Sequence, residues 1–147
     1  MKLIISILFP NIIGFLGNLI GNPNNFDNII KPNFTPNKIV FPIVWIVLYT
    51  LMGVSSYLVY KSNNINKKDA LISYLISLII NSLWSFFFFN LKWYLFSFIW
   101  IILIIITVLI MIYKFYKVDK LSAYIQIPYL IWLIFAAILN FNIYLLN

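Results

Sequence analysis

The 147-residue chain contains no cysteine, no histidine, no arginine and no glutamate. Without cysteine there is no disulfide framework and no thiol chemistry. Without histidine, the chain cannot build a Ser-His-Asp triad or ligate haem iron through imidazole. Its three aspartates (Asp27, Asp69 and Asp119) lie in expected loops, too scattered for a metal site. Any chemistry must therefore belong to a bound molecule or to aromatic side chains that donate electrons.

Charge is scarce as well. Only 9% of the residues are charged and 64% are apolar, whereas a soluble domain is about half apolar and a quarter charged. The mean hydropathy is +1.01. The net charge of +7 comes from lysines that stand singly or in pairs between apolar runs, so no basic arm could follow a nucleic-acid backbone. We interpret the chain as an integral membrane protein.

The apolar runs predict five transmembrane helices, each near the 20 or so residues that a bilayer requires. Residues 101–106 show no apolar–polar alternation, which argues against a strand barrel. The expected spans contain no acidic residue, so a proton-driven carboxylate relay is not expected. The predicted fold class is an all-α membrane protein, a five-transmembrane-helix bundle in a single domain over residues 1–147. Its approximate spans are 3–20, 39–60, 70–89, 93–113 and 121–146.

Three of the four connections are short, so sequential helices should be antiparallel neighbours. Residues 21–38 form the long one, which is rich in Pro and Asn. A slack linker is one interpretation. Because the segment carries Phe26 and Phe34, we predict a lid-like loop that packs onto the bundle.

The lysines predict an orientation. Seven of them fall at the amino end and in the second and fourth loops, and three fall on the opposite side. By the positive-inside rule the amino terminus faces the cytoplasm.

Polar residues inside the spans are the positive signal for function. Ser73, Ser77, Asn81 and Ser85 recur every four residues on one face of the third span. Such a face is either a packing seam or the lining of a cavity. Asn140, deep in the fifth span, must find a hydrogen-bond partner, and the expected role is to tie helices together.

Tryptophans also lie deep in their spans. Trp45, Trp84 and Trp132 are further inside than an aromatic belt at the membrane interface explains. Indoles beside amide and serine groups would suit a large, flat, mostly apolar ligand. Plain packing between helices is the alternative.

Several ordered motifs resemble the TspO/MBR family, the translocator or peripheral-type benzodiazepine receptor proteins. The strongest runs from Lys31-Pro32 through Phe41-Pro42 and Trp45 to Tyr49 and Met52-Gly53. The others are Gly14-Phe15-Leu16-Gly17, Asn81-x-x-Trp84-Ser85 with Phe88-Phe89, and Pro128-Tyr129-Leu130-Ile131-Trp132 followed by Phe135-Ala136 and Leu139-Asn140.

The resemblance implies a five-helix bundle, often dimeric, with a pocket capped by the first loop. It implies an integral membrane receptor or binding protein for porphyrins of the protoporphyrin IX class, involved in tetrapyrrole sensing, transport or disposal. Protoporphyrin IX or a related tetrapyrrole would be a ligand, and no cofactor is expected. The residues that carry over as ligand-binding are Trp45, Tyr49, Asn81, Trp84, Trp132, Ala136 and Leu139.

Two alternatives follow. The first is a light-dependent protoporphyrin-degrading enzyme with Trp45 and Trp132 as its catalytic residues. The second is a passive transporter of small hydrophobic ligands, which the lack of an internal repeat disfavours. The partners expected are a porphyrin, membrane lipid and, in a homodimer, a second copy. The location implied is a bacterial cell membrane.

The chain also departs from the family pattern. The Trp-Tyr pair of the family's first loop is replaced by Asn25-Phe26, and the second proline of its Pro-Pro by Asn37. The Tyr and basic residue of the sterol pattern are replaced by Phe141 and Leu145. Cholesterol is therefore not an expected ligand, and the first loop is expected to hold a ligand differently.

Overall fold

Residues 2–147 are described by the structure, a computed structural model. Within them the chain forms five helices long and apolar enough to cross a membrane, and the described part contains no strand. The elements are α1 (Lys2–Gly21), the 3₁₀ helix η1 (Pro23–Asn28), α2 (Val40–Lys61), α3 (Lys67–Ser85), the π-helical turn η2 (Phe86–Asn90), α4 (Tyr94–Val118), α5 (Lys120–Ile125) and α6 (Ile127–Leu146). The predicted fold class is confirmed.

Two differences between the helix bounds and the expected spans stand out. α4 continues five residues past the expected end at residue 113, to Val118. The fifth span is interrupted at Gln126, between α5 and α6, and Pro128 stands in the first turn of α6. A proline there costs little because the first helical N–H groups have no partner within the helix.

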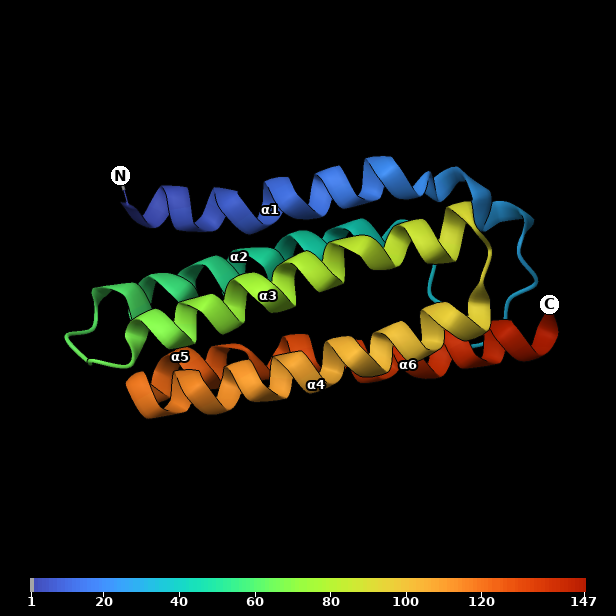
Figure 1. The fold of residues 1–147 in the computed structure, drawn as a ribbon. Helices are drawn as coiled ribbons and strands as arrows, with labels where there is room; N and C mark the ends of the chain where they lie inside the picture. Colours follow the sequence, from blue (N-terminus) through green and yellow to red (C-terminus); the bar gives the residue numbers. More distant parts are fainter. Residues whose placement is uncertain (1) are drawn as a thin grey trace.

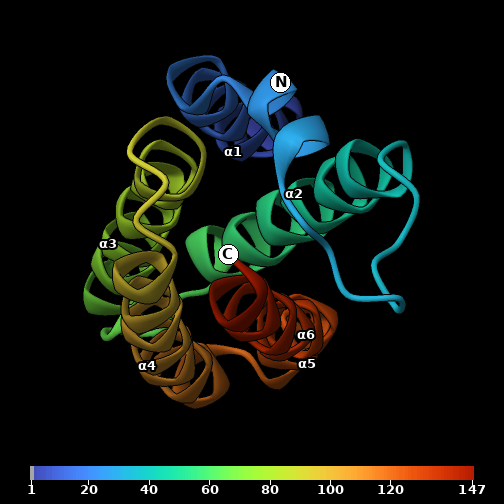
Figure 2. The same cartoon turned by 90° about the vertical axis from the view of Figure 1, so that its right-hand side faces the viewer.

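The spans surround a common interior (Figures 1 and 2). α1 lies against α2 and α3, α4 lies between α3 and α6, and α5 packs on α4 and α2. Aromatic side chains join α2 to α6: the Phe41 and Trp132 rings are 6.0 Å apart, and those of Trp45 and Tyr129 are 6.3 Å apart.

Glycines allow α1 to approach its neighbours closely. A Cβ atom added to Gly53 of α2 would lie 2.5 Å from the Ile7 Cα of α1. One added to Gly17 of α1 would lie 2.7 Å from the Ser82 carbonyl oxygen of α3. Small residues at such crossings let helix backbones pack together where lipid supplies no hydrophobic driving force.

The expected long lid-like loop between the first two helices is not evident in that form. Instead, the connection begins with the six-residue helix η1 and is packed against the end of the bundle. Phe26 of η1 is buried, and Asn25 donates a hydrogen bond of 3.0 Å to the Phe89 carbonyl. The prolines and asparagines that indicated an irregular loop serve here as helix-start and turn residues, with Asn22 left-handed (φ 47°) before Pro23.

Candidate functional site

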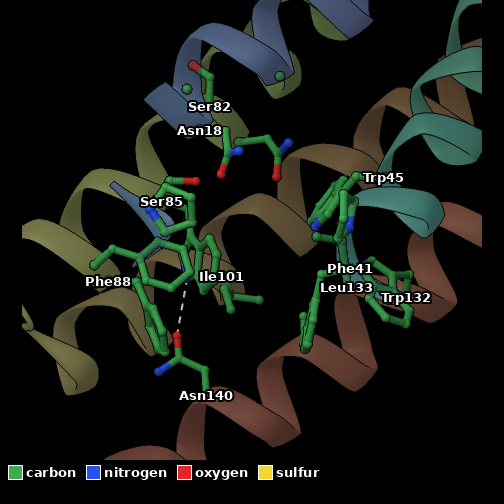
Figure 3. A pocket seen from close by; sticks show the side chains of 18 of the residues that line it. Asn18, Phe41, Trp45, Ser82, Ser85, Phe88, Ile101, Trp132, Leu133 and Asn140 are labelled. Atoms are coloured by element: carbon green, nitrogen blue, oxygen red, sulfur yellow. Dashed lines mark hydrogen bonds between the residues drawn. The ribbon is translucent and has the colours of Figure 1, made fainter. Parts of the chain in front are cut away.

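A cavity of about 370 Å³ lies in the half of the bundle next to η1. Figure 3 shows two opposed groups of side chains, with Phe41, Trp45 and Trp132 on one side and Ser85, Phe88 and Asn140 on the other. The cavity is partly open, because exposed Phe15 and Ile46 are among its lining residues. Its lining thus includes residues at the molecular surface on both α1 and α2.

All the residues named from the resemblance line this one cavity. They come from α2, α3 and α6, so segments far apart in the chain meet here. The set is Trp45, Tyr49, Asn81, Trp84, Trp132, Ala136 and Leu139. Their juxtaposition is a structural fact, whereas their binding of a ligand stays a prediction.

On the α2 side of the cavity, Trp45 and Tyr49 form a stacked pair of rings, and the Tyr49 hydroxyl is hydrogen-bonded to the Asn81 amide. The Trp45 and Tyr49 rings are 5.3 Å apart with an interplanar angle of 27°. The Tyr49 hydroxyl accepts a hydrogen bond of 3.0 Å from Nδ2 of Asn81. This bond links α2 to α3. The indole of Trp45 supplies a flat aromatic surface on the cavity wall.

The polar face of α3 divides at Asn81. On its N-terminal side, Ser73 and Ser77 donate hydrogen bonds to carbonyl oxygens of their own helix and are buried between the helices. Asn81 and Ser85 line the cavity. Packing seam and cavity lining were proposed as alternatives for the whole face, and each describes one half of it.

Asn140 connects three helices. Its Oδ1 accepts from Nε1 of Trp84 at 3.2 Å and from the Ser97 hydroxyl at 3.0 Å. Its Nδ2 donates to the Tyr94 carbonyl at 2.8 Å. The expected structural tie is therefore present in the structure. The residue also lines the cavity, a position not predicted for it.

Phenylalanines that were not among the predicted site residues supply much of the remaining wall. Phe26 packs edge-on against Phe41 at 5.4 Å and against Phe89 at 6.2 Å. Phe88 stacks on Trp84 at 4.8 Å. The aromatic residues of the first connection had indicated that it packs onto the bundle. This is so for Phe26, which lines the cavity, whereas Phe34 is 48% exposed and lies outside the lining.

Among the described residues, Lys38 is the one lining residue that carries a charge. Its Nζ lies 2.6 Å from Oδ2 of Asp27 in η1. The hydrogen bond from Lys38 lowers the pKa of the Asp27 carboxyl from its usual value, and the nearby Lys31 charge adds to the effect. The site is thus an apolar, aromatic cavity with a few amides and a single ion pair at its edge. Such a lining suits binding of a flat apolar body and offers no acid–base pair.

The sequence model described as the TspO/MBR family matches residues 6–146 of the chain. A Tryptophan-rich protein TspO of Archaeoglobus fulgidus is 35% identical over the whole chain and 97% of that protein. One of Bacillus cereus is 30% identical over 83% of the chain and 80% of its own length. The Translocator protein of Sus scrofa is 28% identical over 93% of the chain and 85% of its own length.

Proposed function

The chain belongs to the TspO/MBR family, and from this premise we propose that it is a membrane receptor that binds porphyrins of the protoporphyrin IX class. Its role would be in tetrapyrrole sensing, transport or disposal. One relative, from Cereibacter sphaeroides, is named a tryptophan-rich sensory protein. The five apolar helices make the chain a multi-pass membrane protein in contact with lipid.

The cavity is the observation that carries the proposal. Its volume of about 370 Å³ lies within the usual range for ligand sites, roughly 300–1,000 Å³. Two indoles, Trp45 and Trp132, stand on its wall with the Asn81 amide nearby. Aromatic faces favour stacked or edge-on contact with another ring system. Because the cavity is partly open, a larger ligand can extend beyond it.

Titration of the purified protein with protoporphyrin IX in the dark, followed by quenching of tryptophan fluorescence, tests the proposal. Replacing the indole in Trp132→Phe should weaken binding about two- to tenfold, the equivalent of about 0.5–1.5 kcal/mol of aromatic contact. Trp93→Phe is the matched control because Trp93 is 54% exposed and lies outside the cavity lining. Absence of saturable quenching, or equal weakening in both variants, would refute the proposal.

A second candidate function is light-dependent degradation of the bound porphyrin. The observation in its favour is that Trp45 and Trp132, the two residues expected to be catalytic, share the cavity wall. A Trp45→Phe, Trp132→Phe double variant that binds porphyrin but no longer bleaches its absorbance under illumination would support this function. Wild-type protein that bleaches porphyrin no faster than a detergent control would exclude it.

We also propose an orientation. Seven of the ten lysines lie at the end of the bundle opposite η1, where Lys2 bonds to Tyr60 and Lys114 to Asp69. The positive-inside rule places that end in the cytoplasm. Since the chain has no cysteine, single cysteines at exposed Asn24 and Asn63 can be labelled without background. In whole cells an impermeant maleimide should label Asn24→Cys alone, and the opposite result would reverse the orientation.

A further inference from the structure

Lys38 occupies a particular place at the edge of the cavity. It precedes α2 by two residues, so its charge stands at the end of a membrane span rather than within it. Its side chain is 49% exposed and also lines the cavity. A lysine in such a place lays its methylene stem along apolar surface and keeps its ammonium group near water.

The present partner of Lys38 is weakly held. Asp27 has a side-chain exposure of 63%, and both members of the pair face solvent. Exposed ion pairs contribute about 0–1 kcal/mol, because water screens them and ordering two side chains costs entropy. A carboxylate of another molecule could therefore replace Asp27 at little cost.

The surroundings favour an anion. Lys31 also lies near Asp27, with its Nζ 2.7 Å from the Phe26 carbonyl oxygen and 4.6 Å from the centre of the Phe26 ring. Two lysines thus stand around one aspartate in this part of the connection. When Lys38 is paired with Asp27, the charge of Lys31 leaves this edge of the cavity, the rim, with a net positive charge.

We propose that Lys38 is a specificity-determining residue that binds an acidic substituent of the ligand, taking a ligand carboxylate in place of Asp27. The flat apolar body of the ligand would lie against Phe41 and Trp45, both of which line the cavity with Lys38, and its carboxylate would stay at the rim. This inference rests on the proposed function and adds that the ligand is an acid rather than a neutral ring. A carboxylate inside the apolar cavity would lose its hydration without a partner, which is why the rim is the place for it.

The test compares protoporphyrin IX, which has two carboxylates, with its dimethyl ester, which has none. Both are titrated at pH 7 into protein held in nanodiscs of zwitterionic lipid, so that no anionic lipid competes. The wild type should bind the diacid about two- to fivefold more tightly than the ester, as one exposed ion pair allows. Lys38→Gln should reduce the affinity for the diacid to that for the ester. Asp27→Asn, which frees Lys38, should increase the preference for the diacid.

Lys61→Gln is the matched control, because Lys61 ends α2 at the opposite end of the same helix and should leave the preference at its wild-type value. Repeating the titration with anionic lipid separates two sources of the anion. Competition that disappears in Lys38→Gln would show that a lipid phosphate reaches the same ammonium group and would overturn selectivity for the porphyrin acid.

Equal binding of acid and ester by the wild type, or a preference that persists in Lys38→Gln, would overturn this inference alone. Failure of both porphyrins to bind would overturn the proposed function and the inference together.

Discussion

Two tyrosines beside Trp45, Tyr49 and Tyr129, should change the stability of the protein in opposite directions when each loses its hydroxyl group. Tyr129 is 1% exposed, and its hydroxyl has no hydrogen-bond partner among residues 2–147. The Tyr49 hydroxyl is also buried but accepts the hydrogen bond from Asn81. Replacing either residue with phenylalanine removes one oxygen and keeps the ring, so packing around Trp45 is nearly constant.

The magnitudes follow from the hydrogen bonds. A buried polar group without a partner costs about 1–3 kcal/mol, so Tyr129→Phe should raise the free energy of unfolding by about 1 kcal/mol. A hydrogen bond between membrane helices contributes about 0.6 kcal/mol on average and up to about 1.7. Tyr49→Phe removes such a bond and leaves the Asn81 amide without its acceptor, so it should lower the free energy of unfolding by about 1 kcal/mol.

Reversible unfolding in mixed micelles of increasing SDS content, followed by tryptophan fluorescence, measures both changes. In a thermal scan a change of 1 kcal/mol corresponds to about 2–4 °C for a chain near this size. The two variants should move the midpoint in opposite directions from wild type. If Tyr129→Phe destabilises the protein as much as Tyr49→Phe does, the Tyr129 hydroxyl has a partner, and the reasoning is refuted.

Three further predictions concern other parts of the bundle. Asn140→Leu removes the three hydrogen bonds that connect α6 to Trp84 and α4, so it should lower the free energy of unfolding by about 2 kcal/mol, at about 0.6 each; an unchanged SDS midpoint would contradict this. Gly53→Ala places a Cβ against the Ile7 backbone and should cost about 1–3 kcal/mol in the same assay, whereas wild-type stability would show that α1 can move away freely. Because the pKa of Asp27 is lowered in the folded protein, the stabilisation by its carboxylate is complete above about pH 3.9 and is lost as the pH falls through the lower, folded pKa. Any difference in stability between wild type and Asp27→Asn at pH 7 should therefore shrink below about pH 3.9, and a difference that grew on acidification would contradict this.

Hydropathy alone predicts the five spans, because a bilayer requires about 20 apolar residues in each crossing and imposes this locally along the chain. Short connections likewise predict antiparallel neighbours, and the motifs that resemble the TspO/MBR family predict which residues of α2, α3 and α6 meet in the cavity. Conclusions of this kind depend on composition and spacing within one segment or on a pattern shared with relatives.

Partners distant in the chain could not be predicted in this way. Asn140 bonds to Trp84, 56 residues earlier, and Asn81 to Tyr49, 32 residues earlier, and no local pattern indicates which buried amide finds which acceptor. The pairing of Lys38 with Asp27 depends on how η1 folds back over the bundle.

The division of the α3 polar face has the same origin. Ser77 and Asn81 belong to the same four-residue polar repeat in the sequence, yet Ser77 is packed against Met111 and Asn81 lines the cavity. Sequence by itself determined that this chain is a five-span membrane bundle with a polar face on its third helix, because burial in lipid acts on each segment separately. Only the tertiary structure decided where that face meets a cavity, because a cavity is formed by the distances between helices that converge from separate parts of the chain.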